Sequence, residues 1–176
     1  MVNKVNGTIV ECNTAYNGQR NDTKKHLKVV RAHGFDKIAN VDIMDAEGEI
    51  AIPVNDGIHF DKNFVGKNLK NYDSMLVLSH FKGQVMGGYG GALKNISIDC
   101  DCDSNSTPPE LEDIGIMAST DPVALDMASV NAIYKHHSSK KDSLIKRIES
   151  LNGKHTIDVA YQLGIGNKEY ELVNIE

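Results

Sequence analysis

The order of apolar and polar residues predicts a strand and then a helix at the start of the chain. Residues 7–10 form a short apolar run that predicts a buried strand, and a polar loop follows at 11–20. Asn21 or Asp22 has the side chain needed to cap a helix, which we expect to run to about His33. This strand–loop–helix order is typical of an α/β protein.

Four later segments predict further strands. Residues 49–54 alternate between apolar and polar side chains, which is typical of a half-buried strand. The runs at 74–78 and 114–117 are continuously apolar, as in central parallel strands that are covered on both faces. Residues 170–175 predict a closing strand, which could lie at the edge of a sheet.

Three helices are predicted in the second half of the chain. Thr120 or Asp121 is suited to cap a helix from Pro122 to about Tyr134, which is apolar almost all round and therefore deeply packed. A second, amphipathic helix carries apolar residues at i, i+4 and i+7, namely Leu144, Ile148 and Leu151. A last short helix is expected at 156–163. The whole pattern predicts an α/β fold over residues 1–176, a single domain with a mostly parallel or mixed sheet and helices packed on it.

Composition narrows the class of protein. The 176 residues are 40% hydrophobic and 24% charged, as in an ordinary globular domain, and the formal net charge is −5. This charge argues against a dedicated nucleic-acid binder, which needs clustered cations. No apolar run is long enough to cross a bilayer, so we expect no membrane partner and a cytoplasmic protein. With 3 Cys, we expect reduced thiols rather than a disulfide framework.

Polar residues follow three of the predicted strands, at 11–14, 79–82 and 119–121. Ligands of open α/β sheets bind beyond the carboxyl ends of the strands. If the three strands are parallel, these loops open on one edge and form a site there. The alternative is that loops are polar without binding anything.

The segment from His80 to Asn95 is the densest of these candidates. Its glycines would let backbone N–H groups approach an anion, and lysines would add positive charge. It matches neither the phosphate-loop pattern nor the dinucleotide fingerprint, and a flexible loop without ligand is the alternative. The candidate residues here are His80, Lys82, Gly88, Gly90, Gly91, Lys94 and Asn95.

The Asp-Cys-Asp-Cys-Asp run at 99–103 is a candidate metal site. Cys100 and Cys102 face one way in an extended segment, and two thiolates with His80 could hold a soft metal. Asp101 and its neighbouring carboxylates could instead hold a hard cation. A polar turn without metal is the favoured interpretation.

Isolated polar residues complete the list. Asp126 lies in an apolar helix, where a buried carboxylate must be paired or protonated, so it is either a base or ligand orienter, or a helix-start carboxylate. His80 follows a predicted buried strand and is the candidate acid, base or ligand. Arg20 could clamp an anion or pair with Asp22, and Asn13 lies in the same polar group.

Five blocks of the sequence together resemble a family of uncharacterised iron–sulfur centre proteins with a domain of unknown function (DUF362). These blocks are CNTAYNGQR at 12–20, LSHFKG at 78–83, GGYGGALKN at 87–95, CDCD at 100–103 and DIGIMASTDPVALD at 113–126, and residues 163–173 are similar to the family's C-terminus. The resemblance implies an α/β fold and a bacterial or archaeal cytoplasmic protein. It implies no established reaction.

The resemblance also implies that this chain is abridged. Family members have more chain before the segment that starts here at Asn6, and a longer stretch where this chain has only 96–99, so a seam is expected there. Some members carry ferredoxin-type clusters in that stretch, but this chain has no such set of cysteines. A fainter similarity, to the lactate racemase family, rests on His80 followed by Gly90-Gly91-Ala92-Leu93-Lys94.

The leading hypothesis is therefore a protein that binds a small anionic molecule, or an enzyme of unknown reaction. His80, Lys82, Lys94 and Asn95 would form its site, completed by residues from the set Asn13, Arg20, Cys100, Asp101, Asp121 and Asp126. One alternative is a metal-binding or redox accessory protein with a metal ion as cofactor. The other is a fold remnant without catalysis, or a homo-oligomeric interaction module.

Overall fold

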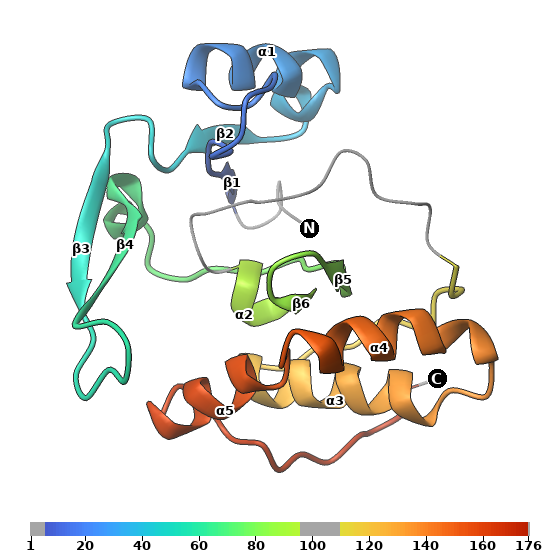
Figure 1. Ribbon diagram of the computed structural model, residues 1–176. Helices are drawn as coiled ribbons and strands as arrows, with labels where there is room; N and C mark the ends of the chain where they lie inside the picture. Colours follow the sequence, from blue (N-terminus) through green and yellow to red (C-terminus); the bar gives the residue numbers. More distant parts are fainter. Residues whose placement is uncertain (1–5, 96–109, 176) are drawn as a thin grey trace. The chain divides into compact units, whose positions relative to one another are not determined.

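The computed structural model describes residues 6–95 and 110–175, and these form two compact units (Figure 1). The first unit contains residues 6–76, and the second contains 77–95 together with 110–175. Both units contain helices and strands, so the prediction of a mixed α/β protein is confirmed. None of the helices in the described ranges is long and apolar enough to cross a membrane.

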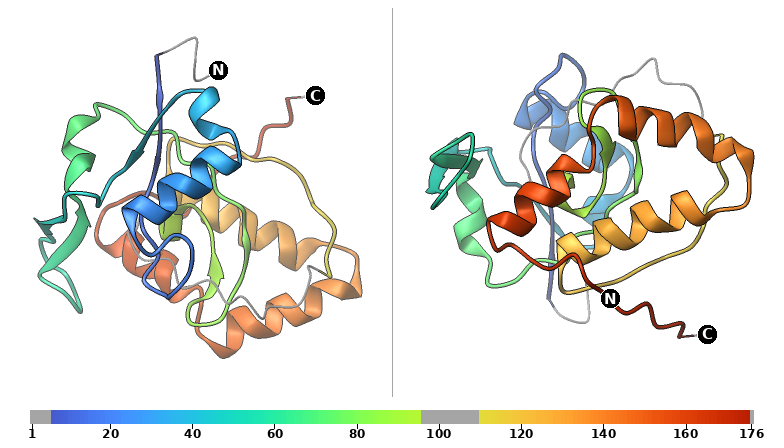
Figure 2. Two further views of the ribbon diagram at one scale, coloured as in Figure 1. Left: turned by 90° about the horizontal axis from the view of Figure 1, so that it is seen from above. Right: turned by 60° about the horizontal axis from the view of Figure 1, so that its bottom comes forward.

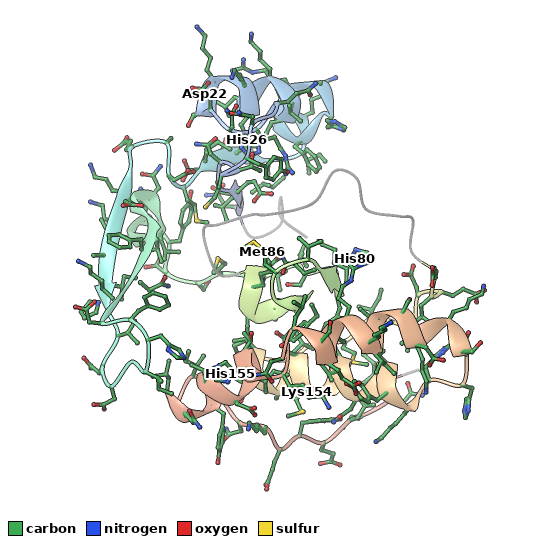
Figure 3. The ribbon with its side chains drawn as sticks, viewed as in Figure 1. Asp22, His26, His80, Met86, Lys154 and His155 are labelled. Atoms are coloured by element: carbon green, nitrogen blue, oxygen red, sulfur yellow. The ribbon has the colours of Figure 1, made fainter. Side chains whose placement is uncertain are left out.

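A β-α-β arrangement opens the first unit. Strand β1 (Thr8–Glu11) is followed by helix α1 (Thr23–Ala32), the 3-10 helix η2 (Phe35–Lys37) and strand β2 (Asn40–Ile43). The strands are parallel, with Thr8 beside Asn40. Asp22, which is labelled in Figure 3, caps the start of α1. Its side chain accepts a hydrogen bond of 3.1 Å from the backbone N–H of Lys25. The predicted strand, cap and helix are thus confirmed.

A β-hairpin and a short helix complete the first unit. Strand β3 (Glu49–Pro53) pairs antiparallel with β4 (Lys62–Gly66), and the 3-10 helix η3 (Lys67–Asn71) follows. The alternating pattern predicted β3 correctly, but the strand is mostly exposed rather than half-buried, and its partner β4 was not predicted.

The second unit combines a small hairpin with helices (Figure 2). Its elements in chain order are β5 (Lys82–Gln84), β6 (Gly88–Gly90), α2 (Ala92–Asn95), α3 (Pro122–Lys135), the 3-10 helix η4 (Ser139–Lys141), α4 (Asp142–Ser150) and α5 (His155–Gln162). Strands β5 and β6 are antiparallel, α4 packs against both of them, and α5 packs against α3. The three predicted helices are confirmed, because local signals such as the Asp121 cap and Pro122 in the first turn mark their ends.

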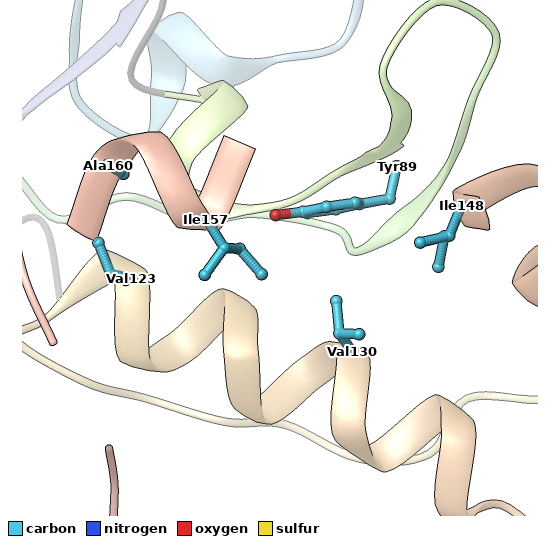
Figure 4. Close-up of a cluster of buried hydrophobic side chains, with 6 residues drawn as sticks. All are labelled: Tyr89, Val123, Val130, Ile148, Ile157 and Ala160. Atoms are coloured by element: carbon cyan, nitrogen blue, oxygen red, sulfur yellow. The ribbon is translucent and has the colours of Figure 1, made fainter. Parts of the chain in front are cut away.

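The core of the second unit is where its helices and the hairpin meet (Figure 4). The buried side chains that form it are Tyr89, Val123, Val130, Ile148, Ile157 and Ala160. Tyr89 reaches this core from β6 and also stacks on Phe81, with ring centroids 4.8 Å apart. The side chain of Tyr89 therefore anchors the hairpin to the helices.

Three predicted strands are not strands in the structure. Residues 74–78, 114–117 and 170–175 have no regular secondary structure, and in them Leu78 is 80% exposed and Ile116 is fully exposed. Apolar composition favours a strand, but a strand also needs a neighbouring chain for its ladder of hydrogen bonds. Instead of one mostly parallel sheet, the described residues form three two-stranded sheets, of which β1–β2 is parallel. The single-domain organisation stays a prediction.

Candidate functional site

The hairpin β5–β6 has one face on the core and one face turned away from it. Lys82 lies opposite Gly90, and Gly83 lies opposite Tyr89. Directly opposed residues of an antiparallel pair point to the same face, and successive residues alternate. A Cβ atom at Gly83 would lie 3.3 Å from Arg147 in α4, and Tyr89 is buried in the core. Lys82 and Gly90 therefore belong to the other face, which we call the outer face of the hairpin; Lys82 is exposed there, whereas Gly90 is buried.

Lys94 reaches the outer face from helix α2. A Cβ atom at Gly90 would lie 3.1 Å from Cδ of Lys94, so the aliphatic part of this lysine covers Gly90 on that face. The Cβ positions of opposed residues are about 5 Å apart. Cδ of Lys94 therefore lies on the same face of the hairpin as the side chain of Lys82, although the two lysines come from different elements.

His80 lies two residues before Lys82 in the chain. Figure 3 shows it beside β5, and its side chain is exposed. Phe81, which separates it from Lys82, is half-buried and stacks on Tyr89 on the core side. The exposed His80 therefore precedes β5 directly after Leu78 and Ser79, and its place in one site with Lys82 and Lys94 stays a prediction.

The fourth predicted catalytic residue, Asp126, lies on the core side of the same hairpin. Its carboxylate accepts hydrogen bonds from the backbone N–H groups of Ala92 at 2.6 Å and Leu93 at 3.2 Å, and from the Tyr89 hydroxyl at 3.5 Å. Burial raises the pKa of Asp126, although these three hydrogen bonds oppose the shift. Burial, followed by the charge of Asp126, also raises the pKa of Tyr89. Two backbone N–H groups of the segment predicted to bind an anion, those of Ala92 and Leu93, thus already donate to a carboxylate of the protein itself.

The predicted glycines allow close packing in this region. Gly88 has a φ of 82°, in the left-handed region that favours glycine, and a Cβ atom there would lie 3.1 Å from Cα of Ile148. Gly91 faces the carboxylate of Asp126, where a Cβ atom would collide with it. Asn95 donates a hydrogen bond of 3.0 Å from Nδ2 to the backbone carbonyl of Leu78. These three residues therefore have packing or hydrogen-bonding roles within the protein.

Asp121 acts at the start of α3. Its carboxylate accepts hydrogen bonds from the N–H groups of Val123 at 2.9 Å, Ala124 at 3.0 Å and Asn167 at 2.7 Å. Desolvation raises the pKa of Asp121, but the hydrogen bonds outweigh it and hold this pKa below its ordinary value. Asp121 therefore connects the helix start to the segment that follows α5.

Asn13 and Arg20 belong to the first unit. Asn13 contacts three neighbours: its backbone N–H donates to Asp45 at 2.9 Å, its Nδ2 donates to Thr23 at 3.0 Å, and its Oδ1 lies 3.4 Å from Nδ1 of His26. Parallel pairing of β1 and β2 explains the first contact, because it brings the ends of both strands together. The Arg20 guanidinium donates a hydrogen bond of 3.3 Å to the Tyr16 hydroxyl, and its role as an anion clamp stays a prediction.

Two titratable groups are buried near Asn13. His26 has a lowered pKa, chiefly because burial disfavours its charged form. Burial and the carboxylates of Asp45, Glu11 and Asp42 raise the pKa of the Cys12 thiol to about 12. A thiol that keeps its proton at neutral pH is a poor nucleophile, so this cysteine is a packing residue.

The predicted metal ligands Cys100, Asp101 and Cys102 lie outside the described residues. Within 6–95 and 110–175, no group of three or more His, Cys, Asp or Glu side chains is arranged to hold a metal ion. The metal prediction thus stays a prediction.

Sequence reasoning missed two residues, one in each unit, that hold candidate residues in place. Tyr89 anchors the hairpin to the core, and Asp45 holds the backbone of Asn13. The adjacent Gly87 and Gly88 are a turn signal that could have revealed the hairpin, and with it the placement of Tyr89. The role of Asp45 follows only from the pairing of β1 with β2.

Comparison with known proteins identifies a family but no described relative. A family model for a domain of unknown function (DUF362) matches residues 1–98, which is more than half of the chain. No curated protein and no solved structure matches. The extent of the match to the family model shows that this chain belongs to the DUF362 family.

Proposed function

We propose that the chain binds a small anionic molecule, such as a carboxylate or phosphate compound, on the outer face of the hairpin β5–β6. The observation that supports this most directly is the register of the hairpin: Lys82 lies opposite Gly90, and Lys94 covers Gly90 on the same face. The side chains of two lysines from different elements therefore extend over one face of the hairpin, with Lys82 exposed and Lys94 half-buried. His80 beside them would be the group that donates or accepts a proton in any reaction.

The expected affinity is modest. Ion pairs at exposed sites contribute roughly 1 kcal/mol or less each, because water screens them. Two lysines together with His80 would then give a dissociation constant in about the millimolar range for a simple dianion. A natural ligand with further contacts would bind more tightly. A small molecule remains the proposed partner, and the net charge of −5 supports it over nucleic acid.

Titration with sulfate tests this proposal. The backbone amide signals of the full chain are followed by NMR, and those of Lys82, Gly90 and Lys94 are expected to shift together. Lys82→Ala and Lys94→Ala should each weaken sulfate binding about fivefold, equivalent to about 1 kcal/mol. Lys140→Ala, which removes an exposed lysine of η4, is the matched control and should bind sulfate like wild type. Equal affinity in all four proteins would refute the proposal.

A further inference from the structure

One buried carboxylate holds both sides of the turn between β6 and α2. Asp126 in α3 is 1% exposed and accepts hydrogen bonds from Tyr89, before the turn, and from Ala92 and Leu93, after it. Gly91 lies between these donors, at a position where a side chain would displace the carboxylate. The path of the chain from β6 into α2 is therefore set by this single group.

The same turn decides where Lys94 lies. Lys94 follows Leu93, whose N–H donates to Asp126, and its side chain extends back over Gly90. If the turn opened, α2 would no longer hold the lysine over Gly90 opposite Lys82. The contacts of Asp126 on the core side thus bear on the arrangement of charges on the outer face.

We propose that Asp126 is a positioning residue for the anion site: its ionised carboxylate holds the β6–α2 turn in the shape that lays Lys94 beside Lys82. This inference rests on the proposed function, because it concerns the same site. Asp126 itself faces the core side of the hairpin and touches no ligand on the outer face.

Substitution of Asp126 by asparagine separates positioning from electrostatics, because the two effects change the affinity for an anion in opposite directions. Removing a negative charge near a cationic surface strengthens anion binding by Coulomb's law alone. Asparagine, however, offers one amide oxygen and an NH₂ group, which is a donor and cannot accept from a second backbone N–H. The turn then loses one of its hydrogen bonds, and anion binding weakens.

The pH dependence of the wild-type protein provides a second, independent measurement. Burial raises the pKa of Asp126, so this carboxylate takes up its proton at a higher pH than an ordinary aspartate. The groups that face it or its donors are Tyr89 from β6 and, through Tyr89, Asp158 from α5. Protonation weakens the turn, so sulfate binding should fall as the solution is acidified towards the range where Asp126 titrates. If the lysines did not depend on Asp126, their affinity for sulfate would stay constant or rise on acidification.

The experiment measures sulfate affinity in the full chain and in four variants. Asp126→Asn should raise the dissociation constant about fivefold, comparable to the loss of one lysine. Asp158→Asn, which removes another carboxylate of the same unit, should leave the dissociation constant for sulfate unchanged or slightly lower. In a Lys94→Ala background, the further change Asp126→Asn should have no additional effect, because the lysine it positions is already gone.

The outcomes separate the two proposals. Sulfate binding that depends on Lys82 and Lys94 but is unchanged or stronger in a folded Asp126→Asn variant overturns only this inference, as does an additive effect in the double variant. If Asp126→Asn fails to fold, the wild-type pH profile decides, and a constant or rising affinity on acidification overturns the inference. Loss of the lysine dependence itself overturns the proposed function as well.

Discussion

Substitution of Gly91 by alanine tests the contact on which the hairpin's shape depends. Gly91 does not have a positive φ, so its backbone conformation accepts alanine without strain. The obstacle is the Asp126 carboxylate, which occupies the space that the new methyl group needs. The variant therefore perturbs one buried interaction and leaves the local backbone preference unchanged.

The expected loss of stability follows from the hydrogen bonds that the carboxylate must give up. A hydrogen bond to a charged group contributes about 1.5–3 kcal/mol, and both Ala92 and Leu93 donate one to Asp126. Alanine in place of glycine restricts the unfolded chain and returns about 0.4–1 kcal/mol. We expect a net loss of about 3 kcal/mol in the free energy of unfolding, equivalent to a decrease in Tm of roughly 6–12 °C.

Urea and thermal denaturation followed by circular dichroism measure this loss, and hydrogen exchange reports on the Ala92 and Leu93 amides. Gly83→Ala is the matched control in the same hairpin. A Cβ atom there would lie 3.3 Å from the side chains of Leu144 and Arg147, which can move, so the loss should stay within about 1 kcal/mol. A Gly91→Ala protein as stable as wild type, with both amides still protected, would show that Asp126 does not hold this turn.

Two further predictions concern the core and the first unit. Ile148→Ala should lower the free energy of unfolding by about 2–5 kcal/mol in urea denaturation, because this fully buried side chain leaves a cavity in the core; a loss below about 1 kcal/mol would contradict the packing in Figure 4. The folded state raises the pKa of Cys12 to about 12, so the stabilisation linked to its bound proton is complete below the ordinary thiol pKa and is lost as pH rises towards 12. Wild type should therefore lose more stability than Cys12→Ala between about pH 8 and pH 10, and equal losses would contradict the burial of this thiol.

The helices were predictable because their signals are local. Asp22 and Asp121 accept hydrogen bonds from the first turns of α1 and α3, and a cap of this kind is visible in a few consecutive residues. The alternation at 49–54 likewise predicted β3. The apolar runs at 74–78 and 114–117 wrongly predicted strands, because apolar composition does not show whether a neighbouring strand is present to pair with them.

The candidate site was predictable in its residue types but not in its geometry. The glycines and lysines of 80–95 indicated an anion site, yet their spacing did not reveal that this segment contains a hairpin. The register of that hairpin divides the candidates between two faces. Lys82 and Lys94 lie on the outer face, while Asp126 supports the turn from the core side.

The amino-acid sequence by itself determined the starts of α1 and α3, the mixed α/β class and the residues with chemistry to offer, because each of these depends on near neighbours in the chain. The tertiary structure alone decided that α3 presents a carboxylate to the backbone of a distant glycine-rich turn. Such a contact depends on how separate elements pack, and the free energy of burying a charge is recovered only once its hydrogen-bond donors are in place.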